Sequence, residues 1–361
     1  NTLMTSEGGF YEPGAFDLRG GSPRPTAIAR WISDVTSRGR SEHPVLAEPG
    51  WWRRPERLIY PAVSVGWRGR VQSRVRIRRK DIVILGAVGP LLDEAARVCD
   101  VRGLAHRLVD VRTAGDDFDP DGAWALLDLS PSDNEHAGPR LARIARKNGC
   151  RLVALSSHRV FEGGAGAPFV ESAKPMPNRY SRRERLILNE APEALIIRTG
   201  PLFGLKEPTE PVGDGWPARS SPTYAPDATN ELFDLLIDGE HGVWHVANVG
   251  SVTHAEFAAL REAVSSTPAL DGGPGPTDRQ GAGLGDTTLL SERGSILPLL
   301  EDALIRWAGE KDHRRGFPLI ADDWLEAAAA ELQTESPSAP AFSAPAAVPT
   351  STRSVGSRRD R

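Results

Sequence analysis

The sequence predicts an α/β fold built on a doubly wound parallel sheet, followed by a small C-terminal lobe and flanked by irregular extensions. Two observations carry this prediction: short apolar runs alternate with helix-length amphipathic segments, and glycine or proline residues lie between them. Short apolar runs are typical of strands buried on both faces, and their alternation with helices indicates βαβ units. Because parallel crossovers are right-handed, helices should cover both faces of the sheet, with ligands at the carboxyl ends of the strands.

Five strands and three helices are expected in the central part of the chain. The strands are short apolar runs at residues 81–85, 105–111, 123–129, 151–156 and 194–198. The helices have apolar residues near helical spacing and lie at residues 90–101, 139–148 and 179–189. Gly103 and Gly149 follow the first two helices, and glycine is strongly preferred just past a helix C-terminus.

The 361 residues divide into three predicted regions. Residues 1–77 are rich in glycine, proline and arginine, contain one plausible helix and show no core of their own. Residues 78–310 hold the alternating pattern, with the second lobe beginning near residue 201. Residues 311–361 are expected to form a terminal helix and a disordered tail rich in serine, proline and alanine.

Composition and charge exclude several classes of protein. With 44 basic and 48 acidic residues, the net charge of −4 provides no basic field for nucleic acid or anionic lipid. No apolar run approaches the roughly 20 residues of a membrane span, and no signal-peptide pattern opens the sequence. The two cysteines exclude a disulfide scaffold and a four-cysteine zinc site, and the eight histidines are scattered. We therefore expect a cytoplasmic protein without a metal site, binding neither nucleic acid nor membrane.

The first predicted strand runs into the turn Gly86-Ala-Val88-Gly89-Pro90-Leu-Leu92, which opens the first predicted helix. In a dinucleotide-binding fingerprint, one glycine permits the tight turn, a second lets the backbone approach the pyrophosphate, and a third lets helix and strand pack closely. The helix N-terminus favours the negative charge of the phosphates. Because the first two glycines are present and the third position is Leu92, the pattern indicates either a dinucleotide-binding turn or a plain strand–helix turn.

An acidic residue about 20 positions beyond the glycine turn would bind the ribose 2′-hydroxyl of NAD. Asp110 lies at the end of the next predicted strand, 24 residues after Gly86. Arg107 and Arg112 flank Asp110 and could instead bind the 2′-phosphate of NADP. The expected cofactor is therefore NADP or NAD, and the sequence leaves the choice open.

Several short motifs follow one another in a fixed order along the chain. They are Ser156-Ser157-His-Arg-Val-Phe-Glu-Gly163, Pro168-Phe-Val-Glu171, Pro175-Met-Pro-Asn-Arg-Tyr180, Ile197-Arg-Thr-Gly-Pro-Leu-Phe-Gly204, Ser221-Pro-Thr-Tyr224-Ala-Pro-Asp227 and Gly242-Val-Trp-His-Val-Ala-Asn248. Over roughly residues 80–308, this set resembles the extended short-chain dehydrogenase/reductases, and specifically the dTDP-4-dehydrorhamnose reductase family of sugar nucleotide-binding proteins. The resemblance implies a Rossmann-like NAD(P)-binding domain and a nucleotide-sugar substrate.

The resemblance also implies roles for individual residues. Ser157 would hold the carbonyl oxygen of the substrate, and Tyr180 would donate a proton to it. A lysine four residues after the tyrosine, on the same helix face, would meet the nicotinamide ribose and stabilise tyrosinate, but this position is Glu184. Ser221 and Tyr224 would contact the substrate. The cofactor would be bound by Gly86, Val88, Gly89, Pro90, Asp110, Arg112, Ser156 and Thr199.

Glu184 is a departure from the family with a chemical consequence. A unit charge about 4 Å away is worth on the order of 4 kcal/mol at an effective dielectric near 20, so a carboxylate there opposes formation of tyrosinate. Arg183 could compensate in part. The segments before Ser157 and between Gly204 and Ser221 are also shorter than is usual in the family.

The sequence therefore supports two hypotheses about function. The first is an NAD(P)-dependent reductase of a nucleotide-linked 4-keto-6-deoxysugar with weakened or lost turnover. The second is a non-catalytic descendant that binds a nucleotide or a partner protein.

The two ends of the sequence carry a further resemblance. Tyr11-Glu-Pro-Gly-Ala-Phe-Asp17 resembles the last segment of a family 1 glycosidase. Ser291-Glu-Arg-Gly294 and the segment from Leu297 resemble the end of bacterial reductases joined behind such an enzyme. We therefore expect residues 1–77 to be a glycosidase remnant or linker, with a possible glycosidase domain or partner upstream.

Overall fold

The computed structural model describes residues 14–48, 80–205, 216–264 and 285–316, apart from residues 21, 88, 132–133 and 163, with side chains described as far as residue 309. The chain divides into two compact units, Asn1–Glu310 and Lys311–Arg361. Of the second unit, only the end of one helix is described. The predictions for residues 1–13, for Val88 and for the tail beyond residue 316 lie outside the described residues.

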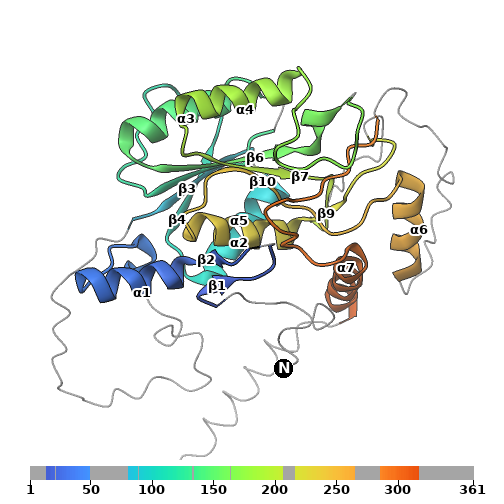
Figure 1. Cartoon of the computed structure of the whole chain (residues 1–361), viewed down its shortest axis with the longest axis horizontal. Coiled ribbons are helices and arrows are strands. Elements are labelled where there is room, and N and C mark those ends of the chain that lie inside the picture. Colours follow the sequence, from blue (N-terminus) through green and yellow to red (C-terminus); the bar gives the residue numbers. More distant parts are fainter. Residues whose placement is uncertain are drawn as a thin grey trace, which may run out of the picture. The chain divides into compact units, whose positions relative to one another are not determined.

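Six parallel strands form the central sheet (Figure 1). Across the sheet they are β10 (Gly242–His245), β7 (Leu195–Thr199), β6 (Arg151–Ser157), β5 (Ala125–Asp128), β3 (Ile82–Gly86) and β4 (His106–Asp110). The strands β3, β5 and β7 are buried along their whole length, as expected for strands covered on both faces. The predicted parallel sheet is confirmed.

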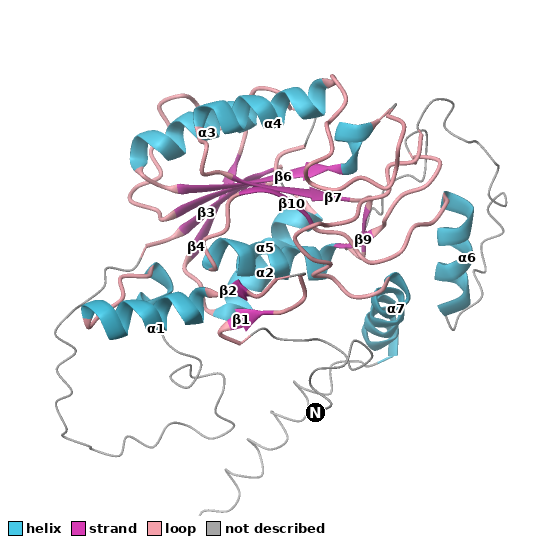
Figure 2. Cartoon of the chain, in the orientation of Figure 1, coloured by secondary structure: helices cyan, strands magenta, loops and turns pink. Residues whose placement is uncertain are grey.

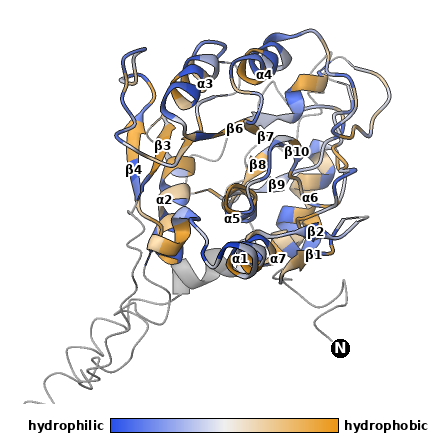
Figure 3. Cartoon of the chain, turned by 60° about the vertical axis from the view of Figure 1, so that its left-hand side comes forward, coloured by the Kyte–Doolittle hydropathy of each residue, from blue (hydrophilic) through white to orange (hydrophobic). Residues whose placement is uncertain are grey.

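Helices cover both faces of the sheet, as Figure 2 shows. The helices α3 (Ala137–Asn148) and α4 (Arg179–Glu190) lie on one face. The helices α2 (Pro90–Arg102) and α5 (Ala225–Ile237) lie on the other. In Figure 3, α3 and α4 carry both hydrophobic and hydrophilic residues, as amphipathic helices over a sheet do.

The side chains of β3 show how the sheet divides the core. Ile82 and Ile84 belong to the apolar cluster that includes residues of α2 and α5. Val83 and Leu85 belong to the cluster that includes residues of α3 and α4. Successive side chains of a strand point to opposite faces, so one apolar strand supplies two cores. The doubly wound prediction is therefore also confirmed.

Local signals set the ends of the helices. Gly103 (φ 67°) and Gly149 (φ 64°) end α2 and α3 in the left-handed conformation, at the positions that the sequence predicts. The helix α4 begins with a reciprocal cap, in which Asn178 accepts a hydrogen bond from the Ser181 amide and Ser181 Oγ accepts one from the Asn178 amide. This cap fixes the first turn of α4, which contains Tyr180.

A smaller lobe is formed by segments that come after β7 in the sequence. It contains β8 (Leu202–Phe203), β9 (Thr223–Tyr224), α6 (His254–Val264) and α7 (Leu300–Gly316). Its apolar cluster includes Phe203, Tyr224, Phe257 and Trp307. A short 3₁₀ helix, η5 (His158–Phe161), follows β6. In the parts of the chain that the structure describes, no helix has the length and apolar character needed to cross a bilayer.

Residues 14–48 form an N-terminal arm with more structure than the sequence predicts. The arm contains the strand pair β1 (Phe16–Asp17) and β2 (Arg24–Pro25), the helix α1 (Ala27–Arg38) and a 3₁₀ helix, η2 (Pro44–Ala47). No residue of α1 is fully buried. Charged contacts, together with the packing of Val45 against the main apolar cluster, attach the arm to the rest of the unit.

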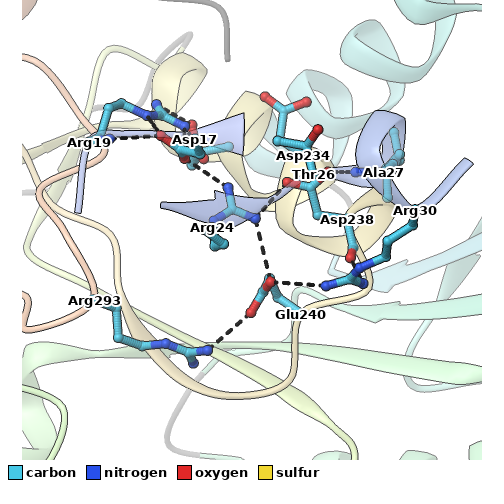
Figure 4. Close-up of polar contacts among 12 residues, drawn as sticks. Asp17, Arg19, Arg24, Thr26, Ala27, Arg30, Asp234, Asp238, Glu240 and Arg293 are labelled. Atoms are coloured by element: carbon cyan, nitrogen blue, oxygen red, sulfur yellow. Dashed lines mark hydrogen bonds and ion pairs between the residues drawn. The ribbon is translucent and has the colours of Figure 1, made fainter. Parts of the chain in front are cut away.

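Charged residues of the arm pair with charged residues of the rest of the unit, and Figure 4 shows several of these pairs. Asp17 accepts hydrogen bonds from Arg19 and Arg24 at 2.9 and 2.8 Å. Arg19 also binds Glu231 of α5 at 3.1 Å, and Arg24 binds Asp238 at 2.6 Å. Burial alone would raise the pKa of Asp17, but the hydrogen bonds from Arg19 and Arg24 outweigh it and lower the pKa to about 2.

Candidate functional site

The two glycines of the predicted dinucleotide turn have different surroundings. A Cβ atom on Gly86 would lie 3.2 Å from Leu92 Cδ1 and 3.4 Å from Leu129 Cβ, so this glycine allows α2 to pack closely on β3. A Cβ atom on Gly89 would have nothing within 4 Å. Pro90 occupies the first turn of α2, where its missing N–H costs no intrahelical hydrogen bond. One side of the turn is therefore closed by leucines, and the backbone at Gly89 is open.

Asp110 lies beside the glycine turn, because the register of β3 and β4 pairs it with Gly86. Arg112 Nη2 donates a hydrogen bond to Asp110 Oδ2 at 2.6 Å, and this partner lowers the pKa of Asp110. The Arg112 side chain is 81% exposed. Arg107 instead donates to the carbonyl oxygen of Pro120. Of the two arginines that flank Asp110, Arg112 is the one that pairs with it.

A small apolar cavity lies near the same end of the sheet. Its volume is about 10 Å³, and its lining includes Leu91 of α2, Leu129 after β5 and Leu155 of β6, together with Leu202, Ala225, Ala228, Thr229 and Leu232. Such a volume is about the minimum that holds one water molecule. The leucines therefore leave no room for a cofactor ring in this cavity as it stands.

Tyr180 lies in the first turn of α4 and is only 3% exposed. Its ring packs in an apolar cluster that includes Phe161 and Phe169. Arg179 Nη2 donates a hydrogen bond to Tyr180 Oη at 3.0 Å. The guanidinium carbons of Arg179 and Arg159 lie 5.0 and 5.3 Å from the centre of the ring. Two cations therefore flank the phenol.

Ser157 ends β6, and its Oγ accepts a hydrogen bond from the Arg159 amide at 3.3 Å. Arg159 thus contacts Ser157 through its backbone and Tyr180 through its guanidinium. Arg159 is therefore a common neighbour of the two residues to which the family resemblance assigns the reacting carbonyl. His158 is buried beside them, where burial lowers its pKa to about 4.

The carboxylate of Glu184 binds partners other than Tyr180. Arg198 Nη2 lies 2.7 Å from Glu184 Oε2, and Ser156 Oγ donates to Glu184 Oε1 at 2.6 Å. Arg198 Nη1 also lies 3.2 Å from His245 Nε2. Within the described part of the chain, Glu184 and Tyr180 share no hydrogen bond. Glu184 is thus part of a buried ion pair between α4 and β7.

Arg183 forms a second buried ion pair. Its Nη2 lies 2.6 Å from Asp128 Oδ2, and its Nη1 donates to the carbonyl oxygen of Leu155 at 3.0 Å. These contacts attach α4 to the ends of β5 and β6. Arg183 is therefore engaged with the sheet, through Asp128 and Leu155, rather than with the Tyr180 hydroxyl.

The remaining predicted site residues lie in the interior. The carbonyl oxygen of Thr199 lies 3.3 Å from Nδ1 of His158. The Oγ1 of Thr199 donates to the carbonyl oxygen of Ser156 at 3.5 Å. Ser221 and Tyr224 are each 1% exposed. Ser221 Oγ bonds to the backbone of Leu289 at 3.3 Å. In this conformation both predicted substrate residues are covered by protein.

Sequence reasoning did not identify Arg198, Arg179 or Arg159 as site residues. The register of β6 and β7 pairs Ser156 with Arg198, and a register cannot be read from either strand alone. Arg179 directly precedes Tyr180, so the predicted helix start could have revealed it.

The six-stranded parallel sheet with helices on both faces and the glycine turn at its carboxyl edge define the class: a Rossmann-like α/β protein. Comparison with known proteins then specifies the relationship. Residues 120–210 match the family described as RmlD substrate binding domain.

Two kinds of relative support the same relationship. The chain is 29% identical over 164 residues to a dTDP-4-keto-6-deoxy-D-glucose reductase of Streptomyces niveus, covering 40% of this chain and 56% of that protein. It therefore spans just over half the length of that relative. The dTDP-4-dehydrorhamnose reductases of Bacillus anthracis, in complex with NADP, and of Clostridium acetobutylicum superpose with TM-scores of 0.52 and 0.51. They are 18% and 16% identical, and each match covers 64% of this chain and 99% of the other. The chain is a homologue of the dTDP-sugar reductases, and the resemblance seen in its motifs is confirmed.

Proposed function

We propose that this chain is an NAD(P)-dependent reductase of a nucleotide-linked 4-keto-6-deoxysugar in which the chemical step is weakened. The observation that carries this proposal is the arrangement of Ser157 and Tyr180 about Arg159, at the carboxyl end of β6. In open α/β sheets, ligands bind outside the carboxyl ends of the strands, where the glycine turn also lies. The homology to dTDP-sugar reductases supplies the substrate class.

The residues at the glycine turn fit the adenosine and pyrophosphate parts of a dinucleotide. The space beside Gly89 is open, and the N-terminus of α2 there favours phosphate charge. Asp110 is suited to accept a hydrogen bond from a ribose hydroxyl, and the exposed guanidinium of Arg112 is suited to a 2′-phosphate. The cofactor is therefore NADP or NAD, and when bound it would supply a hydride.

This chain's own residues would manage the proton. Tyr180 would donate its phenolic proton to the carbonyl oxygen of the sugar, and Ser157 would hydrogen-bond to the same oxygen. The phenolate that remains needs a nearby cation, because the reference pKa of tyrosine is about 10. The residue at the family's lysine position, Glu184, is bound to Arg198 and supplies none. An interaction on the order of 4 kcal/mol corresponds to about three powers of ten in rate, so we expect the chemical step to be weakened as far as no other cation replaces the lysine.

A second candidate function is a non-catalytic descendant that binds a nucleotide or a partner protein. The cavity of about 10 Å³ among the leucines favours it, because this part of the cofactor region is filled by apolar side chains. The burial of Ser221 and Tyr224 favours it as well. A cytoplasmic location and an upstream glycosidase domain or partner stay predictions from the sequence, as does the absence of nucleic-acid binding, which rests on the net charge of −4.

Calorimetric titration with NADPH, NADH and dTDP distinguishes these functions. A reductase site should bind a reduced nicotinamide cofactor as well as the dTDP moiety, whereas a nucleotide-binding descendant should bind dTDP alone. An absence of heat and of any thermal stabilisation with NADPH and NADH at millimolar concentration would rule out the reductase. Replacing Arg112 with Gln should weaken NADPH more than NADH, since only NADPH carries the 2′-phosphate.

A further inference from the structure

We infer that Arg179 supplies the cation that stabilises Tyr180 as a phenolate. The consequence for catalysis rests on the proposed reductase function, but the effect on the phenol does not. Arg179 Nη2 lies 3.0 Å from Tyr180 Oη. A guanidinium has only N–H donors, so the phenol oxygen is the acceptor of this bond. A hydrogen bond of this kind strengthens when its acceptor becomes an anion.

The surroundings of Tyr180 make a cation necessary. The phenol is almost fully buried among apolar residues, and burial by itself disfavours the charged form. Charged and titratable groups lie on the elements packed around it: Arg159 and His158 of η5, Glu162 after η5, and Arg179, Arg183 and Glu184 of α4. The anions in this set are already bound, Glu162 by Arg159 and Glu184 by Arg198. Arg183 is bound by Asp128.

Arg179 is therefore the cation with a direct hydrogen bond to the phenol oxygen. Arg159 faces the ring rather than the hydroxyl, and it shares its charge with Glu162. The position of Arg179 is also unfavourable for the helix that carries it. It occupies the first residue of α4, where the helix dipole disfavours positive charge. A role at Tyr180 explains a cation at this position, which helix stability alone does not.

In the proposed reduction, Arg179 would stabilise the negative charge that proton transfer leaves on Tyr180. The O–H bond of Tyr180 breaks and an O–H bond forms on the carbonyl oxygen of the sugar. When bound, the reduced nicotinamide would supply the hydride for the new C–H bond and would itself be oxidised, and the ketone would become an alcohol. The negative charge left on Tyr180 Oη would be held by the Arg179 guanidinium until a proton returns.

Ultraviolet titration of the phenol tests this inference without substrate or cofactor. Subtracting the titration of Tyr180→Phe from that of the full chain isolates Tyr180 from the other three tyrosines. We expect Arg179→Gln to raise the midpoint by about one pH unit or more, since an opposite charge at this distance shifts a pKa by about 1–3 units. Arg179→Lys should retain most of the wild-type midpoint. Arg182→Gln, at a 62% exposed arginine on the same helix, should leave it unchanged.

The outcomes separate this inference from the proposed function. An unchanged midpoint in a folded Arg179→Gln variant would overturn the inference, whether or not the chain reduces a sugar. A raised midpoint in a chain without turnover would support the inference and count against the reductase. If Arg179→Gln does not fold, Arg179→Met, which also removes the positive charge, replaces it: a midpoint equal to those of wild type and Arg182→Gln overturns the inference. In an active chain, Arg179→Gln should lower kcat with little change in KM, and Arg179→Lys should restore it in part.

Discussion

The guanidinium of Arg198 lies 2.7 Å from the carboxylate of Glu184, and neither side chain is more than 4% exposed. Position 184, where the family resemblance implies a lysine, is here one half of a buried ion pair that joins α4 to β7. The pair also accepts a hydrogen bond from Ser156 and contacts His245. The acidic residue therefore belongs to the core, and its charge is balanced before any ligand binds.

Removing one half of this pair should strongly destabilise the fold. We expect Glu184→Gln to lower the free energy of unfolding by about 3–5 kcal/mol, because it leaves Arg198 buried without a countercharge. Glu184→Lys, the substitution that would restore the family's residue, should be worse, since it places a second cation beside Arg198. Denaturant unfolding measures both effects.

A double variant provides the control for this prediction. Replacing Glu184 and Arg198 together with Met removes both charges and should cost less than either single substitution. If Glu184→Lys were as stable as wild type, the ion pair would not be the structural element described above.

Substitution by alanine should destabilise the fold at Gly86 but have little effect on its stability at Gly89. Gly86→Ala should lower stability by about 1–3 kcal/mol, because the new methyl group meets Leu92 and Leu129. Gly89→Ala should change stability by less than about 1 kcal/mol, because its Cβ has open space and its extended backbone (φ 163°) suits any residue. Gly89→Ala should nevertheless weaken NADPH binding in calorimetry. Equal NADPH affinity in wild type and Gly89→Ala would show that the pyrophosphate does not approach this turn.

The buried His158 should make the fold sensitive to acid. Above pH 6.5 the imidazole is neutral in both the folded and the unfolded chain. As the pH falls below 6.5, the unfolded chain binds the proton first, because burial lowers the folded pKa to about 4. The folded state should therefore lose about 3 kcal/mol between pH 6.5 and 4.

The variant His158→Gln isolates this contribution, since all other titrating groups are common to both proteins. Chemical unfolding at several pH values should show that the variant loses less stability than wild type over that range. Parallel losses in the two proteins would contradict the assignment of the acid sensitivity to His158.

The N-terminal arm should detach when its central arginine is removed. Arg24 binds both Asp17 and Asp238, so Arg24→Gln leaves two largely buried carboxylates without this partner. Subtilisin should then cleave residues 14–38 faster than in wild type. Arg38→Gln is the matched control, because Arg38 is 77% exposed and exposed ion pairs contribute less than about 1 kcal/mol. Cleavage of Arg24→Gln at the wild-type rate would show that the arm is held by other contacts.

The sheet and its helices could be predicted because their signals are local. The run Ile82-Val-Ile-Leu85 is buried on both faces, and Gly103 and Gly149 cap helices through their own backbone conformation. The attachment of the arm could not be predicted, because Arg19 and Arg24 bind Glu231 and Asp238 more than 200 residues away, and charged contacts leave no periodic pattern.

The candidate site was predictable in part for the same reason. Its motif residues, Ser157 and Tyr180, are recognised from neighbouring sequence. The partner of Glu184 could not be predicted. Arg198 lies on β7, and only the register of β6 and β7 places it beside Ser156 and Glu184. A charge at position 184 alone suggested repulsion of tyrosinate, whereas the fold neutralises that charge.

The most direct test of the central claim is the oxidation of NADPH or NADH by this chain in the presence of a dTDP-linked 4-keto-6-deoxysugar, with wild type and Tyr180→Phe compared. The account predicts slow oxidation that depends on the sugar and is abolished in Tyr180→Phe. Oxidation at the same rate in Tyr180→Phe would contradict it, because the proton would then come from a group other than the phenol.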